Sequence, residues 1–185
     1  MFEKIIALDK KAFVFLNSLG SETYDGFWLI ITKQWTWIPF FLLLFYLLQQ
    51  KIGWRNLGIA LVYIGLLMFL CDQSANLFKV TFERLRPCND PEIKDVIRIV
   101  KPSITYSFFS AHAANSMAAM VFAYSLLKRY YKFGLWVFVF PLVFAYSRIY
   151  LGVHFPGDIL FGYLFGGFFG WLFFKHYSKK YFQAI

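Results

Sequence analysis

The sequence predicts an all-α integral membrane protein: a bundle of about five membrane-spanning helices with an interfacial helix at the N-terminus. The first reason is composition. The 185 residues are 59% hydrophobic and 23% aromatic, and the mean hydropathy is +0.54, well above the values typical of a soluble domain. The second reason is that the apolar residues gather in five runs separated by short polar or basic segments. We therefore expect one membrane-embedded domain over residues 1–185.

Each expected span combines an apolar run with polar ends, because no run alone reaches the roughly 18 residues that mark a spanning helix. Before the first span, apolar residues such as Phe2, Ile5 and Phe13 recur at helical spacing, and Tyr24–Thr32 forms a second apolar piece. Residues 1–34 are therefore expected to form one or two interfacial helices, with a sixth span as the alternative. Asp9 interrupts the apolar face of the first helix without an evident reason. The spans are expected near residues 35–50, 56–79, 110–128, 133–147 and 157–175.

The basic loops predict the orientation of the chain. Nineteen Lys and Arg against ten Asp and Glu give a net charge of +9, and basic residues follow the first, third and fifth expected spans. Short basic loops face the cytoplasm, so residues 79–110 and 148–158 should share the outer face of the membrane. Nucleic acid is excluded as a partner, since no stretch combines clustered basic residues with exposed aromatics outside the apolar runs. The basic residues are Lys51, Arg55, Lys128, Arg129, Lys132, Lys175, Lys179 and Lys180.

A polar stripe and a basic segment follow the second span. Asp72, Asn76 and Lys79 are spaced for one face of a continuing helix, which is predicted to look into the bundle as a functional stripe or as packing between helices. Three cations, Lys79, Arg84 and Arg86, lie within "KVTFERLRP". Arginine offers a planar fork that matches phosphate oxygens, and lysine adds a point charge. Taken alone, the segment is explained better by an ordinary basic loop that binds lipid head groups.

A second polar cluster, Ser110-Ala111-His112 in "SFFSAHAANS", opens the third span. A hydroxyl, backbone N–H groups at the positive end of a helix and an imidazole together suit an anionic oxygen. The alternative is an N-cap serine followed by a structural histidine.

A third cluster, "SRIYLGVHFPGD", contains Arg148, His154 and Asp158. Asp158 lies four residues after His154, so it can accept a hydrogen bond from one ring nitrogen and leave the other as a nucleophile. Alternatively, Asp158 merely complements the dipole of a helix that begins at Pro156. Two of the three histidines of the chain lie in these clusters on one predicted face, which favours a shared chemical role.

The three clusters resemble, in order and spacing, the three signatures of the type-2 phosphatidic acid phosphatase superfamily, which shares its phosphate site with vanadium-dependent haloperoxidases. The second signature departs from the family pattern, because Ala111 stands where the family usually has glycine. Alanine still donates its backbone N–H if its φ is negative. The matching stretches are Lys79 through Arg86-Pro87, then Ser110-Ala111-His112, then Ser147-Arg148 through His154 to Asp158.

The resemblance implies that His154 attacks phosphorus to give a phosphohistidine, oriented by Asp158. His112 would protonate the leaving oxygen and later help to activate water. No metal and no other cofactor is implied. A bell-shaped pH profile is expected, because His154 must be neutral while His112 is protonated. The residues implied to hold the phosphate are Lys79, Arg86, Ser110, Ala111 and Arg148.

The expected substrate is a lipid phosphate or diphosphate drawn from the bilayer at the outer face. Among the substrates of the family, the resemblance makes undecaprenyl diphosphate the leading candidate, with phosphatidylglycerol phosphate, phosphatidic acid and lipid A as alternatives. The compact bacterial members of the family imply a location in the bacterial cytoplasmic (inner) membrane. A non-enzymatic membrane protein that binds anions or lipids is a further alternative, but it would need the cations without the pair His154 and Asp158. Residues 88–101 are expected to form a solvated outer loop rather than a lid.

Overall fold

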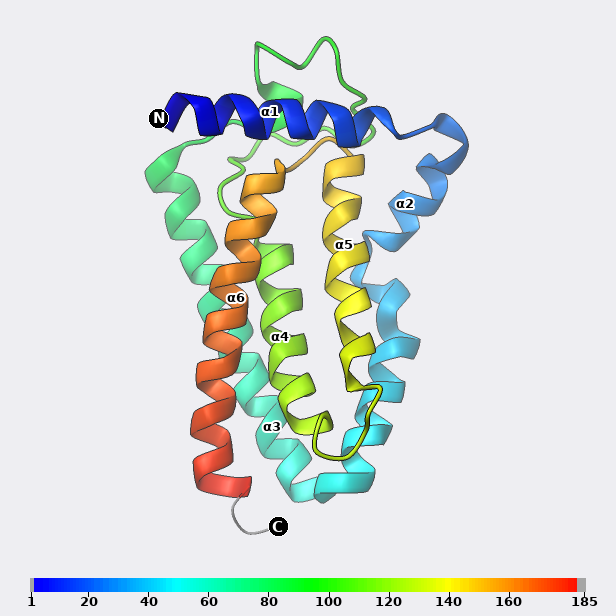
Figure 1. Cartoon of the computed structure of the whole chain (residues 1–185), viewed down its shortest axis with the longest axis vertical. Helices are drawn as coiled ribbons and strands as arrows, with labels where there is room; N and C mark the ends of the chain where they lie inside the picture. Colours follow the sequence, from blue (N-terminus) through cyan, green and yellow to red (C-terminus); the bar gives the residue numbers. More distant parts are fainter. Residues whose placement is uncertain (1, 183–185) are drawn as a thin grey trace.

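The computed structural model describes residues 2–182, and within them every regular element is helical. Helices α3 to α6 run side by side along the long axis, and α1 lies across one end of this bundle (Figure 1). The predicted all-helical membrane bundle with a separate N-terminal helix is therefore confirmed. The helices are α1 (Phe2–Ser18), α2 (Asp25–Ile31), α3 (Ile38–Phe82), α4 (Ala111–Leu127), α5 (Val139–Tyr150) and α6 (Pro156–Tyr177).

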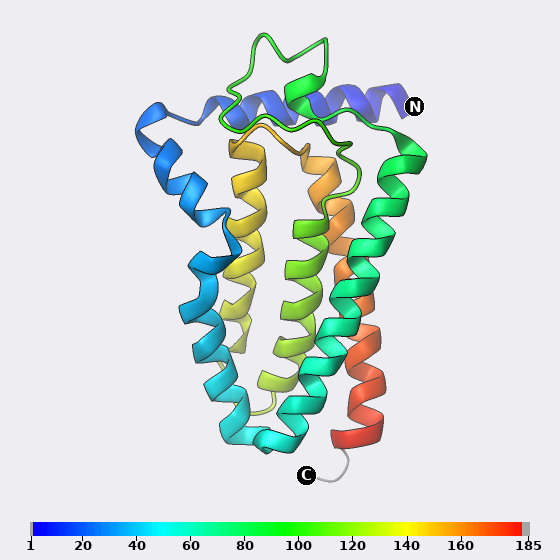
Figure 2. The same ribbon diagram turned by 180° about the vertical axis from the view of Figure 1, so that it is seen from behind.

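Helix α3 consists of two arms that meet at Gly53. Gly53 has φ of +73° and ψ of 167°, a conformation that glycine adopts without steric cost. The chain reverses there, so the first arm runs toward the end of the bundle opposite α1 and the second arm returns (Figure 2). The segments Gln34–Asn89 and Pro156–Tyr181 are long and apolar enough to cross a membrane. Large apolar side chains remain exposed on their outer faces, among them Leu42, Leu66, Phe69, Leu164 and Phe168.

Helix α4 lies in the centre of the bundle and packs most closely against α6. Gly162, Gly166 and Gly170 are spaced four residues apart on α6 and lie against the α4 backbone. A Cβ atom at Gly166 would lie 2.1 Å from the carbonyl oxygen of Ala114. Small residues of this spacing let two membrane helices approach closely. This contact sets the separation between the start of α4 and the start of α6.

One end of the bundle is closed by α1 and by the long connection between α3 and α4. The side-chain amide of Asn17 in α1 donates to the carbonyl oxygen of Ile149 at the end of α5, and its oxygen accepts from the backbone N–H of Arg98. Lys10 of α1 lies 2.7 Å from Asp90 in the connection. Arg98 pairs with Asp25 at the start of α2. The connection is thus tied to α1 and α2, and α1 in turn to α5.

Candidate active site

The three polar clusters meet at the end of the bundle covered by α1. The second arm of α3 brings Lys79 to this end, α4 begins here with Ala111, and the turn between α5 and α6 carries His154. Their side chains enclose a cavity of about 200 Å³. The cavity is lined by Lys79, Arg86, Lys101, Pro102, Ser103, Ala111, His112, Arg148, Val153 and His154.

His154 is buried, with 3% of its surface exposed, and its two ring nitrogens have different partners. Nδ1 lies 3.4 Å from Oδ2 of Asp158, and Nε2 lies 3.2 Å from Nη1 of Arg86. A guanidinium only donates hydrogen bonds, so Nε2 is the acceptor and the ring proton lies on Nδ1, facing the carboxylate. His154 lines the cavity, so its unprotonated Nε2, beside Arg86, is the ring nitrogen that can act there as a nucleophile.

Burial lowers the pKa of His154 to about 4, although the neighbouring Asp158 carboxylate acts to raise it. The imidazole is therefore neutral at neutral pH. Asp158 is fully buried, and its Oδ2 also accepts the backbone N–H of Phe155 at 3.0 Å. The carboxylate thus holds both the ring of His154 and the first turn of α6.

Two threonines that sequence reasoning missed hold the site arginines in place. Arg86 donates from Nη2 to Oγ1 of Thr105 at 2.9 Å, and Arg148 donates from Nη1 to Oγ1 of Thr32 at 2.8 Å. No local pattern marks either threonine, because each lies in an irregular segment far along the chain from its arginine. These bonds orient two guanidinium groups toward one cavity.

Arg148 also contacts His112, since its Nη2 donates to Nε2 of the His112 ring. Its Nε is buried and has no hydrogen-bond partner within residues 2–182. A buried N–H without a partner is costly, so this donor is available to an anion in the cavity. The structure thus brings together Arg148 and His112, two of the residues singled out in the sequence.

The structure places Ser110 and Ala111 differently with respect to the cavity. Ser110 is fully buried, its hydroxyl oxygen accepts the backbone N–H of Ala113 as the N-cap of α4, and it does not line the cavity. Ala111 does line it. Glu83 is the one non-glycine residue within residues 2–182 that has a positive φ. Ala111 therefore has the negative φ that alanine needs. The backbone N–H at position 111 can therefore donate a hydrogen bond without a glycine at this position.

The polar stripe of α3 does not face the bundle along its whole length. Asp72 accepts a hydrogen bond of 2.8 Å from the side-chain amide of Asn115 in α4, and Lys79 lines the cavity. Asn76 is exposed, so the prediction that the complete stripe looks inward is wrong for this residue.

The helices have apolar outer faces, and they surround a histidine–aspartate pair and several cations. This combination defines a membrane-embedded site for phosphoryl transfer. The sequence comparison agrees with this class. The model of the PAP2 superfamily matches residues 56–182. The chain belongs to the PAP2 superfamily and is a lipid phosphatase of that family.

Relatives of known name extend over nearly the whole chain. A lipid A 4'-phosphatase from Bacteroides thetaiotaomicron is 33% identical over 94% of this chain and 79% of its own length. An undecaprenyl-diphosphatase from Sulfolobus acidocaldarius is 27% identical over 92% of this chain and 79% of its own. The crystal structure of a PAP2-type phosphatidylglycerolphosphate phosphatase from Bacillus subtilis superposes with a TM-score of 0.70 at 18% identity, covering 96% of this chain and 87% of that one. At this low identity, the similarity to the Bacillus subtilis structure shows a shared fold.

Proposed function

We propose that the protein releases inorganic phosphate from a membrane lipid through a phosphohistidine at His154, without a metal ion. The observation that carries this proposal is the ring of His154, whose Nδ1 faces Asp158 and whose Nε2 faces a cavity lined by cations. A lipid-binding protein would need the cations, but it would not need a buried, neutral imidazole oriented by a carboxylate.

In the first step, Nε2 of His154 forms a bond to phosphorus while the bond from phosphorus to the lipid oxygen breaks. The departing oxygen takes a proton from His112. In the second step, His112 accepts a proton from water, the water oxygen attacks phosphorus, and the bond from phosphorus to His154 breaks to release phosphate. Lys79, Arg86 and Arg148 neutralise the phosphoryl oxygens in both steps. Because these three cations neutralise the negative charge of the phosphoryl oxygens, neither step needs a divalent metal ion.

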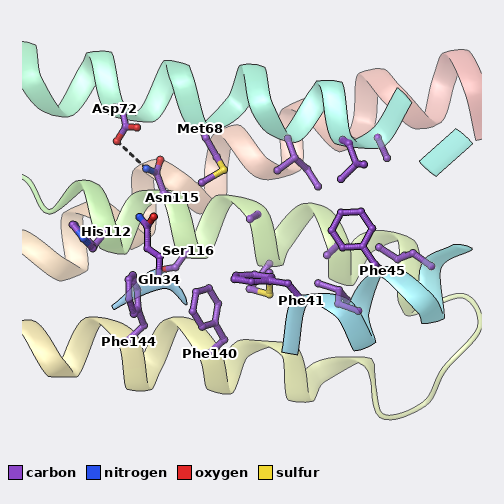
Figure 3. Close-up of a pocket in the computed structure, with 18 of the residues that line it drawn as sticks. Gln34, Phe41, Phe45, Met68, Asp72, His112, Asn115, Ser116, Phe140 and Phe144 are labelled. Carbon is purple, nitrogen blue, oxygen red and sulfur yellow. Dashed lines mark hydrogen bonds between the residues drawn. The ribbon is translucent and has the colours of Figure 1, made fainter. Parts of the chain in front are cut away.

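A second cavity explains how the site could take a substrate with an apolar tail. It measures about 350 Å³ and lies between the two arms of α3, α4 and α5. Figure 3 shows His112 near one end and apolar side chains such as Phe41 and Phe45 toward the other. His112 and Ala111 line both cavities. A lipid could thus place its phosphate beside His154 while its tail stays at bilayer depth.

Among lipids, the phosphate monoester of lipid A is our first candidate, because the relative with 33% identity is a lipid A 4'-phosphatase. Undecaprenyl diphosphate is the second candidate, since the relative with 27% identity is an undecaprenyl-diphosphatase. We further propose that the site faces the outer side of the bacterial cytoplasmic membrane. Lys51 and Arg55 flank the turn of α3 at the opposite end of the bundle, where the positive-inside rule places the cytoplasm.

Removal of divalent ions is expected to leave the activity intact. The experiment measures phosphate release in detergent with EDTA from lipid A, undecaprenyl diphosphate, phosphatidylglycerol phosphate and phosphatidic acid. We expect the fastest release from lipid A and equal rates with and without EDTA. Activity that EDTA abolishes and Mg²⁺ restores would contradict the metal-independent steps. No release from any of the four lipids would favour the non-enzymatic alternative.

Filling the larger cavity is expected to weaken binding of lipids with long tails. Ala119 lines this cavity on α4, and a phenylalanine there would displace part of the tail. If about two methylene groups lose their contacts at ~0.8 kcal/mol each, KM rises roughly tenfold. The measurement compares KM for long-chain and dioctanoyl phosphatidic acid in Ala119→Phe. The control is Leu66→Phe, at an exposed position of α3, which should change neither KM. An equal effect on both lipids would contradict a tail site.

A further inference from the structure

Three charged side chains outside the substrate cavity form a chain that ends at the catalytic carboxylate. Arg84 donates from Nη1 to Oδ1 of Asp158 at 2.7 Å and from Nη2 to Oδ2 of Asp9 at 2.7 Å. Asp9 also accepts the backbone N–H of Gly157 through Oδ1 at 2.7 Å. The side chains of Asp9, Arg84 and Asp158 are only 12%, 24% and 0% exposed. These contacts account for a charge on the apolar face of α1.

Local structure directs Arg84 to this place. Glu83 ends α3 in the left-handed conformation with φ of +46°, which turns the chain toward the start of α6. The Arg84 guanidinium then lies 4.1 Å from the ring centroid of Phe155, a favourable contact between a cation and an aromatic face. At Gly157, a Cβ atom would lie 2.7 Å from Oδ2 of Asp9. Glycine at this position therefore lets α1 reach the first turn of α6.

The two oxygens of Asp158 have separate tasks. Oδ2 faces Nδ1 of His154 and the backbone N–H of Phe155, whereas Oδ1 is bound by Arg84. Within residues 2–182, Asp158 has two ion-pair partners, Arg84 and His154. Arg84 is the arginine of the two and supplies the permanent positive charge. A fully buried carboxylate without a cation is strongly disfavoured in its charged form. Loss of Arg84 would therefore leave Asp158 buried without this cation and no longer held with Oδ2 toward the Nδ1–H group of His154.

We propose that Arg84 is a positioning residue for the reaction, and that Asp9 of helix α1 holds Arg84 in place. Arg84 holds the Asp158 carboxylate turned so that Oδ2 accepts a hydrogen bond from the Nδ1–H group of His154. Helix α1, which covers this end of the bundle, therefore helps to orient the nucleophile through Asp9. This inference rests on the proposed role of His154 as the nucleophile. Arg84 touches neither cavity, so its effect is on turnover rather than on substrate binding.

The test measures kcat and KM for Arg84→Gln, Arg84→Lys and Asp9→Asn with lipid A, or with undecaprenyl diphosphate if that lipid is hydrolysed faster. Loss of a partner that orients a metal-ligating side chain typically costs about 10- to 100-fold, and we expect kcat of Arg84→Gln to fall by a similar factor with KM nearly unchanged. Arg84→Lys keeps the charge and should recover most of kcat. Asp9→Asn should lower kcat less than Arg84→Gln does. The matched control is Arg98→Gln, which removes a similarly exposed arginine from its pair with Asp25 and should keep kcat.

Three results would overturn the proposal: an unchanged kcat in Arg84→Gln, a loss that appears only as a higher KM, or an Arg84→Lys variant as slow as Arg84→Gln. If the melting curve shows that Arg84→Gln does not fold, the test rests on Asp9→Asn. An unchanged kcat in Asp9→Asn would then overturn the proposal. His154→Ala is assayed beside these variants. Activity retained in His154→Ala would refute the proposed function itself, whereas an inactive His154→Ala with a fully active Arg84→Gln would refute only the role of Arg84.

Discussion

His154→Ala is expected to abolish phosphate release. The substitution removes the only nitrogen that faces the cavity with Asp158 behind it among the described residues. Loss of the nucleophile alone costs about 10⁶-fold in kcat in a protease that reacts through a covalent intermediate, so we expect a loss of at least about 10⁴-fold here. Lipid binding should persist, because Lys79, Arg86 and Arg148 remain. The measurement is phosphate release from lipid A at saturating concentration, combined with a lipid-binding assay.

The control for this prediction is His176→Ala. His176 lies at the opposite end of α6, where its Nδ1 lies 3.1 Å from the hydroxyl of Tyr63, so its removal should leave kcat unchanged. His112→Ala is expected to be slow rather than inactive, since a proton can reach the leaving oxygen from water at a lower rate. Equal rates for His154→Ala and His176→Ala would show that the reaction proceeds by another nucleophile.

Gly166→Ala is expected to destabilise the protein and to slow it at the same time. The added Cβ would lie 2.1 Å from the carbonyl oxygen of Ala114, so α4 and α6 must move apart. Overpacking of this kind costs about 1–3 kcal/mol. The same movement separates His112 at the start of α4 from His154 before α6, and a misplacement of about 1 Å can cost roughly 100-fold in rate. The measurements are the melting temperature in detergent and kcat.

The neighbouring glycine provides the matched control for this second prediction. At Gly167 an added Cβ would lie 3.8 Å from Met117 and 4.0 Å from Val121, which is ordinary contact distance. Gly167→Ala should therefore keep both the melting temperature and kcat. If Gly166→Ala melts at the same temperature as Gly167→Ala, the close approach of α4 and α6 does not determine the stability of the bundle.

The general plan of the fold could be predicted because hydropathy and basic loops act locally. Apolar runs and their polar ends predicted the helical bundle, and Gly53 lies between the basic residues Lys51 and Arg55 at the predicted turn. The close packing of α4 on α6 could not be predicted in this way. It depends on Gly166 meeting Ala114, and glycine spacing on one helix does not indicate which neighbour it contacts.

The site was predictable where its chemistry lies within a few residues. His154 and Asp158 are four positions apart, and the structure brings them together. Asp9 had no explanation in the sequence, because its partners Arg84 and Gly157 lie 75 and 148 positions away. The hydroxyl of Ser110 could equally cap a helix or face an anion, and only the packing at the start of α4 places it as a cap.

The most direct test of the proposed chemistry is to trap the phosphorylated enzyme. Lipid A with a radioactive phosphate is mixed with His112→Ala, in which hydrolysis of the intermediate should be slowed, and the reaction is stopped in alkali and digested. The mechanism predicts an acid-labile, alkali-stable label on the peptide that contains His154, and no label in the double variant that also carries His154→Ala. Label on another residue, or undiminished label without His154, would contradict a phosphohistidine at this position.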